Sequence, residues 1–213
     1  MRKKKALGAH PDRDAQFQNS AKLQAEYQAA GDPVMSIDTK KKELIGNFAR
    51  DGHTLTQVPV EVLDHDFPSA GEGKLISHGL YDVARNEGYI HLNTSHDTRE
   101  FCCDSIAHWW EQHGAQHDPL LLLCDGGGSN AANRHVFKEA LQALANRLGL
   151  DIRIAHYPPD CSKHNPIEHR LFPHLTRACQ GVVFHSLDIA KQFMERTQTS
   201  KGLTVNVAFL TGV

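Results

Sequence analysis

The sequence predicts an α/β fold in which helices flank a five-stranded mixed sheet. Two observations lead to this prediction: β-type segments fill the first half of the chain, and strands alternate with helices in the second half. Consecutive short strands pair as antiparallel neighbours, whereas alternating strands and helices build the parallel part of a sheet. With 213 residues, 40% of them hydrophobic, the chain is long and apolar enough for one domain with a full core.

The first half of the chain predicts the antiparallel part of the sheet. Residues 1–33 are polar and contain one helix-forming stretch that ends at Gly31-Asp32-Pro33, so we expect an N-terminal arm or linker there. Residues 59–73 are rich in proline, glycine and acids, which is typical of a long loop. We expect three antiparallel strands, drawn from β-type runs at residues 34–38, 42–49, 79–83 and 89–93.

The second half predicts the parallel part of the sheet and the helices that cover it. Residues 119–124 form the most apolar run, which is typical of a buried strand, and Pro158-Pro159 ends a further strand that begins at Asp151. We expect helices at 97–114, 131–148, 166–179 and 186–196, and a last strand at 203–210. Three antiparallel strands followed by parallel strands form a ribonuclease-H-like arrangement, which we assign to residues 34–213.

Composition and charge restrict the classes of function. No apolar run approaches the roughly 20 residues of a membrane span, and the basic first residues are not followed by the apolar stretch of a secretory signal. Five cysteines, an odd number without a Cys-x-x-Cys pair, indicate reduced thiols in a cytoplasm. The net charge of -2 is unusual for a protein that binds DNA, unless the main DNA-binding module lies outside this chain.

Three acidic residues stand at positions suited to a metal centre. Asp38 belongs to the first strand, Asp125 follows the most apolar strand, and Glu168 lies in the first turn of a helix. Ligands gather at the carboxyl ends of parallel strands, and Mg²⁺ or Mn²⁺ prefers oxygen donors such as carboxylates. Two such ions promote phosphoryl transfer by acting on both the attacking and the leaving oxygen. We therefore expect Asp38 to bridge two ions, with Asp125 on one side and Glu168 on the other.

The segments around these acids resemble the motifs of DDE-type, mariner-like transposases of bacterial insertion sequences. Residues 157–168 read Tyr-Pro-Pro-Asp-Cys-Ser-Lys-His-Asn-Pro-Ile-Glu. In that family two prolines end a strand, and Asn-Pro-Ile-Glu opens the helix with the catalytic acid. Residues 123–130, Leu-Cys-Asp-Gly-Gly-Gly-Ser-Asn, are similar to the second motif, an apolar strand that ends in Asp. Residues 36–43, Ser-Ile-Asp-Thr-Lys-Lys-Lys-Glu, are similar to the first motif of one bacterial branch.

The resemblance implies an enzyme that cleaves DNA at transposon ends and joins the freed 3′-hydroxyl to target DNA. It implies two Mg²⁺ or Mn²⁺ ions held by Asp38, Asp125 and Glu168, a homodimer that brings two ends together, and a cytoplasmic, nucleoid-associated location. For exposed lysines the alternative is a solvated strand edge or loop. The residues that we expect to contact DNA are Lys40, Lys42, Lys163, His164 and Asn165.

Other functions stay open at this stage. Residues 126–131, Gly-Gly-Gly-Ser-Asn-Ala, fit the G-x-G-x-x-A pattern of a dinucleotide-dependent enzyme. Against that function, Asp125 would repel a pyrophosphate, and the next strand ends in two prolines instead of a ribose-binding acid. Two further alternatives are a truncated transposase remnant that only binds DNA or protein, and a ribonuclease-H-like nuclease that acts on another nucleic acid. His113 and His117 have helical spacing but no evident further ligands for zinc.

Overall fold

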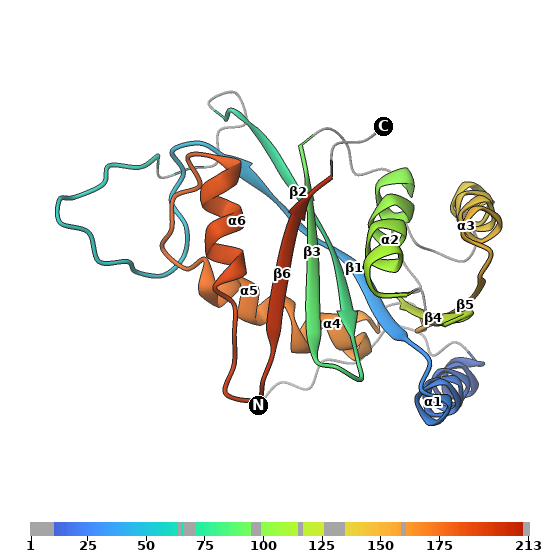
Figure 1. Cartoon of the computed structure of the whole chain (residues 1–213). Helices are drawn as coiled ribbons and strands as arrows, with labels where there is room; N and C mark the ends of the chain where they lie inside the picture. Colours follow the sequence, from blue (N-terminus) through green and yellow to red (C-terminus); the bar gives the residue numbers. More distant parts are fainter. Residues whose placement is uncertain are drawn as a thin grey trace.

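The computed structural model describes residues 11–63, 65, 71–94, 99–114, 117–125, 135–158 and 161–210. Within these residues the chain is built on a six-stranded mixed sheet of order β5-β4-β1-β2-β3-β6 (Figure 1). β1, β2 and β3 pair antiparallel, β4 and β5 extend the sheet in parallel beside β1, and β6 joins β3 in parallel. The strands are β1 (Val34–Ile45), β2 (Gly73–Asp82), β3 (Glu87–Asn93), β4 (Pro119–Cys124), β5 (Asp151–His156) and β6 (Thr204–Phe209).

The α/β class and the order of antiparallel and parallel strands are confirmed, but the sheet has six strands instead of the expected five. The run expected at 34–38 and the first part of the run expected at 42–49 form one long strand, β1, which ends at Ile45 and pairs with β2 across an irregularity between Lys40 and Glu43. β6 is the strand expected at 203–210, and it joins the sheet beside β3 as a sixth strand. Local sequence patterning indicates which segments are extended, whereas the partner of each strand depends on distant residues.

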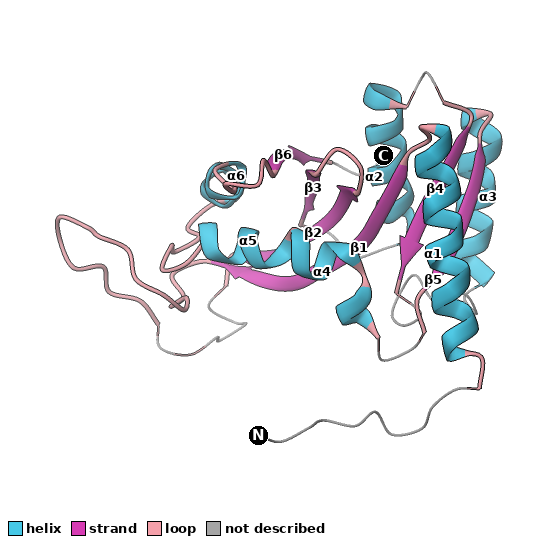
Figure 2. Ribbon diagram, turned by 90° about the horizontal axis from the view of Figure 1, so that it is seen from below, coloured by secondary structure: helices cyan, strands magenta, loops and turns pink. Residues whose placement is uncertain are grey.

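Helices cover both faces of this sheet (Figure 2). α2 and α3 pack on one face through apolar side chains such as Ile106, Trp109 and Leu141. The other four helices pack on the opposite face, with Leu175 and Met194 among the buried residues that they contribute. The helices are α1 (Arg13–Ala30), α2 (Arg99–His113), α3 (His135–Leu148), α4 (Pro166–Arg170), α5 (Phe172–Ala178) and α6 (Leu187–Glu195).

α1 packs on the sheet, so the segment expected to be an N-terminal arm contains a helix that belongs to the folded domain. Leu23 is buried in the same core as residues of β4 and β5, and Phe17 and Tyr27 pack against that core. Gly31 ends the helix, as the sequence predicted, because it adopts a left-handed φ of 81° and its N–H donates to Gln28 O. α1 therefore lies over the parallel half of the sheet.

A glycine in β2 lets α4 and α5 approach the sheet closely. Gly79 lies opposite Asp38 in the β1–β2 ladder. A Cβ atom at position 79 would lie 2.8 Å from Ile167 Cδ1 and 2.7 Å from Phe172 Cε1. Carbon atoms pack favourably only at about 3.5–4.0 Å, so any side chain here would push the helices outward. The short helix that carries Glu168 therefore rests directly on the strand pair around Asp38.

Candidate active site

Asp38 and Asp125 come from neighbouring parallel strands. The paired region of β1 and β4 ends with Ser36 opposite Leu123. The same register, continued for two residues, brings Asp38 opposite Asp125, which directly follows β4. Side chains alternate along a strand, so Asp38 lies on the same face as Ser36. Ser36 in turn contacts the segment that leads into α4.

Glu168 reaches the same region from α4. Pro166 is the first residue of this helix, where its missing N–H costs nothing and its fixed φ is favourable. Ile167 is fully buried against the sheet, which fixes the rotation of the helix and leaves Glu168 partly exposed. The Glu168 carboxyl group lies close enough to Asp38 for a side-chain hydrogen bond. The three acids predicted from the sequence are thus neighbours in space.

Burial and repulsion by neighbouring carboxyl groups raise the pKa of Asp38. The pKa of Asp38 rises from 3.8 to about 7, first because of burial and then because of the nearby Glu168 and Asp125 carboxyl groups. The Thr39 N–H, which donates to Asp38 Oδ1 at 2.8 Å, opposes this rise by favouring the charged form. A cluster of carboxylates that repel one another is a place where a cation is stabilised.

The acid cluster has the donors that a hard divalent cation requires. All three groups offer carboxylate oxygens, the ligands that Mg²⁺ and Mn²⁺ prefer. Asp125 Oδ1 is buried and has no hydrogen-bond partner among the described residues, so this acceptor remains available. Within the described part of the chain, no group of three or more His, Cys, Asp or Glu side chains lies close enough together to hold a metal ion as it stands. The three acids are therefore neighbours, and a bound ion would draw their carboxylate oxygens closer together.

Comparison with known protein families identifies the chain. The family model described as the Rhodopirellula transposase DDE domain matches residues 1–213, which is the whole sequence. The chain belongs to this family of DDE transposases. The family resemblance inferred from the motifs around Asp38, Asp125 and Glu168 is therefore confirmed. No curated protein matches this DDE domain.

Solved structures of the Mos1 transposase share the fold of the DDE domain. The Mos1 paired-end complex with the left transposon end aligns with a TM-score of 0.57 and 13% identity, over 91% of this chain and 58% of that chain. The Mos1 paired-end complexes with Mn and with Mg give TM-scores of 0.54 and 0.56 at 15% and 12% identity. They cover 91% of this chain and 59% and 58% of theirs, so the DDE domain spans less than two thirds of Mos1. The ribonuclease-H-like transposase fold is thereby confirmed.

Two residues expected to contact DNA are turned into the DDE domain. Asn165 is fully buried, and its side-chain amide group bonds to β1. Lys40 pairs through Nζ with Glu43, and only 14% of its side chain is exposed. Burial lowers the pKa of Lys40, with a further contribution from Arg50, which pairs with the same glutamate. In this arrangement neither Asn165 nor Lys40 is presented to DNA.

The other three expected contacts lie on the surface. Lys42 is exposed beside the irregularity in β1. Lys163 and His164 are exposed in a 3-10 turn, Ser162–His164, that leads to α4 and Glu168. Their exposure keeps these three residues as candidates for contacts with a DNA backbone.

The structure adds two basic residues that sequence reasoning missed. The pKa of His164 is lowered by slight burial and by the charges of Lys163, Arg13 and His169. The His164 ring also packs at 4.9 Å from the ring of Phe17 in α1. We call Arg13, Lys163, His164 and His169 the basic cluster. Arg13 is distant in the sequence, so only the packing of α1 reveals its place. His169 could have been suspected, since it follows Glu168 directly.

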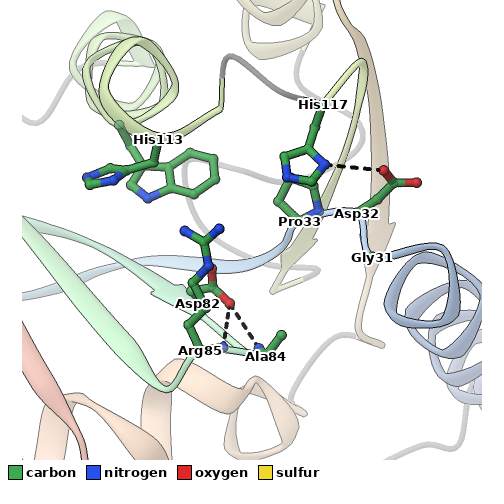
Figure 3. A pocket seen from close by; sticks show the side chains of 9 residues that line it. Gly31, Asp32, Pro33, Asp82, Ala84, Arg85, His113 and His117 are labelled. Atoms are coloured by element: carbon green, nitrogen blue, oxygen red, sulfur yellow. Dashed lines mark hydrogen bonds and ion pairs between the residues drawn. The ribbon is translucent and has the colours of Figure 1, made fainter.

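A small pocket lies at the end of the sheet where β1 begins (Figure 3). Its lining includes His113 and His117, the histidines with helical spacing, together with Asp32 and Asp82. His117 Nδ1 lies 3.6 Å from Asp32 Oδ1. Asp82 Oδ1 accepts backbone N–H groups from Ala84 and Arg85, both at 2.9 Å. Both carboxylates therefore already have partners within the pocket. The pocket lies at the opposite end of β4 from Asp125.

Parts of several sequence predictions lie outside the described residues. They are the glycine-rich segment 126–131 with its dinucleotide-like pattern, the helix starts at 97–98 and 131–134, residues 64 and 66–70 of the predicted loop, and residues 159–160 of the last motif. The family model that matches the whole sequence describes a transposase DDE domain, so it gives no support to the dinucleotide-dependent alternative.

Proposed function

We propose that this domain is a catalytic core that cleaves DNA at transposon ends and joins the freed 3′-hydroxyl to target DNA. The observation that carries the proposal is the convergence of Asp38, Asp125 and Glu168 from β1, β4 and α4. Membership in the DDE transposase family supports it. The Mos1 structures are paired-end complexes, one with the left transposon end and others with Mn or Mg. By analogy, we propose that this chain also binds DNA and these metals.

We propose that Asp38, Asp125 and Glu168 hold two Mg²⁺ or Mn²⁺ ions. When bound, the ions activate the attacking oxygen and stabilise the leaving oxygen of the phosphodiester. Asp38 lies between the other two acids in this electrostatic cluster, which suits the bridging role, and the Thr39 N–H orients its Oδ1. Asp125 contributes a buried oxygen without another partner in the described structure. Glu168, in the first turn of α4, would be the third ligand.

The experiment that tests this function is the nicking of supercoiled DNA by the full chain in Mg²⁺ or Mn²⁺. We expect nicked circles that disappear when the metal is chelated with EDTA. Folded protein that binds DNA without any metal-dependent nicking would instead favour a remnant that acts only in binding. Nicking of RNA–DNA hybrids but not of duplex DNA would favour a ribonuclease-H-like nuclease.

We propose that the basic cluster holds the DNA backbone beside the acids. Lys163→Ala should weaken binding to duplexes of any sequence and reduce the slope of log K against log salt by about one, because each lysine–phosphate contact releases counterions. Fluorescence anisotropy at several salt concentrations measures both quantities. Lys201→Ala, an exposed lysine next to β6, is the matched control and should leave the slope unchanged.

A second comparison separates surface lysines from the buried one. Lys40→Ala should lower the stability of the protein, because it leaves Glu43 without one of its two cations, but it should not change the salt slope. An unchanged slope for Lys163→Ala contradicts the assignment of the basic cluster, and a reduced slope for Lys40→Ala contradicts the conclusion that Lys40 is not presented to DNA.

We propose a homodimer in the complex with DNA, supported by exposed apolar side chains in residues 50–63. This loop extends away from the sheet (Figure 1), with Leu55 fully exposed and Val58 and Val60 69% and 48% exposed. Contiguous apolar groups in water indicate a surface that a partner covers. Leu55→Ser should reduce the dimeric fraction on end DNA in light scattering, whereas Gln57→Ser should not. Equal masses for both variants argue against this surface.

We also propose that the protein acts in the bacterial cytoplasm, at the nucleoid where its DNA substrate lies. None of the described helices is both long and apolar enough to cross a bilayer.

A further inference from the structure

Two buried polar residues connect the strand of Asp38 to the helix of Glu168. Ser36 and Asn165 are both 0% exposed, and they lie in separate segments of the chain. The Ser36 hydroxyl donates to Asn165 Oδ1. The same hydroxyl accepts the backbone N–H of Ile167 at 3.0 Å, and Asn165 Nδ2 donates to the carbonyl oxygen of Ile37 at 3.2 Å.

These bonds hold the backbone immediately before each acid. Ile37 precedes Asp38, and Ile167 precedes Glu168, so each catalytic segment is fixed one residue from its carboxylate. The Ser36 and Asn165 side chains are fully buried. Water cannot replace a lost bond there, and a hydrogen bond is electrostatically stronger than in solvent. Asn165 also begins α4, because its carbonyl oxygen accepts the Glu168 N–H at 3.0 Å.

The link also resists a force that acts inside the site. Asp38 and Glu168 are acids held close together, and like charges repel. Without a tether, α4 can relieve this repulsion by moving away from β1, and the two carboxylates would then be too far apart to share an ion. The three hydrogen bonds oppose that movement directly, since each of them joins β1 to the start of α4.

We propose that Ser36 and Asn165 are positioning residues that set the separation of Asp38 and Glu168 for metal binding. The proposal rests on the proposed function, because it assumes that these acids are metal ligands. Both side chains are 0% exposed, so this role acts through the backbone beside each acid and not through contact with an ion or with DNA. Groups that orient metal ligands through hydrogen bonds typically change metal affinity by 10–100-fold when they are removed.

The test is the Mn²⁺ affinity of the full chain without DNA, measured by calorimetry, together with the melting temperature. Ser36→Ala and Asn165→Ala should each weaken Mn²⁺ binding by about 10–100-fold. Ser105→Ala is the matched control: Ser105 is also 0% exposed, and its hydroxyl donates to Phe101 O at 2.8 Å within α2, away from the acids. It should lower the melting temperature and leave the Mn²⁺ affinity within twofold of wild type.

The double variant Ser36→Ala with Asn165→Ala provides an independent measure. Because the two residues share a bond, the double variant should lose much less affinity than the product of the two single losses. If Ser36→Ala does not fold at the assay temperature, Ser36→Cys keeps the size of the side chain and weakens its hydrogen bonds. It should then show the loss of affinity instead.

The possible failures are distinguishable. A wild-type chain that binds no Mn²⁺ and nicks no DNA overturns the proposed function, and the positioning role with it. A wild-type chain that does both, with unchanged Mn²⁺ affinity in the Ser36 and Asn165 variants, overturns the positioning role alone. A loss of affinity in Ser105→Ala as large as in Ser36→Ala shows a general effect of stability and also overturns it.

Discussion

Asp125→Asn should abolish metal-dependent nicking of DNA while the protein remains folded. The variant keeps the shape of the side chain but loses the charge that attracts a divalent ion. Metal-assisted stabilisation of a transition state contributes several kcal/mol, and ~4 kcal/mol corresponds to about a thousandfold in rate. We therefore expect nicking to fall by at least about a thousandfold, measured as the initial rate of conversion of supercoiled DNA at saturating Mn²⁺.

The control for this change is Asp151→Asn, the same substitution at an exposed position where β5 begins. It should keep the wild-type rate. Asp38→Asn and Glu168→Gln should show losses similar to that of Asp125→Asn, because the three acids form one site. Nicking by Asp125→Asn within tenfold of wild type would remove Asp125 from the set of ligands, whatever the other two variants show.

The sequence allowed the acids to be located because each one adjoins a local signal. Asp125 follows the run Leu-Leu-Leu-Leu-Cys of β4, and Glu168 follows a proline that starts a helix. That Asp38 lies beside Asp125 depends on the parallel register of β1 and β4, whose residues are far apart in the chain. Such a register depends on how the whole sheet packs, so it cannot be predicted from a local sequence pattern.

The predicted DNA contacts show where composition alone misleads. Lys40 and Lys42 look alike in the sequence, but Lys40 is partly buried beside Glu43 whereas Lys42 is exposed. The difference comes from the irregularity between Lys40 and Glu43, which a run of three lysines does not indicate. Asn165 was expected to contact DNA, but its side chain is fully buried. Its burial is explained by partners more than 120 residues away in the sequence.

The metal-free protein should become more stable when Asp38 is changed to Asn. The folded-state pKa of Asp38 is about 7, above the ordinary value of 3.8, so the folded protein holds a proton that the unfolded chain has released between these values. The contribution of Asp38 to stability therefore falls as pH rises from about 4 to 7 and stays unfavourable above pH 7. A change from 3.8 to about 7 corresponds to ~4 kcal/mol at most.

Because Asp38 is partly exposed, solvent screening reduces this effect, and we expect Asp38→Asn to add about 1–3 kcal/mol at pH 7.5 in EDTA. Asn keeps an oxygen that can accept the Thr39 N–H, so that bond survives. Urea unfolding at pH 7.5 and pH 4.5 measures the difference, which should shrink at the lower pH. Asp51→Asn, at an exposed position, should differ from wild type at neither pH.

Adding Mn²⁺ should reverse the order of stability. An ion that binds only the folded state stabilises it in proportion to its affinity, and Asp38→Asn lacks one of the carboxylates that attract it. Wild type should therefore gain stability with Mn²⁺ while Asp38→Asn gains little. A variant that is less stable than wild type in EDTA at pH 7.5 would show that burial of Asp38 and its repulsion by the neighbouring carboxylates do not limit the stability of the free site. Equal gains with Mn²⁺ would show that Asp38 is not a ligand. The two results are independent, so the electrostatic cost of the acid cluster and its use in metal binding can be judged separately.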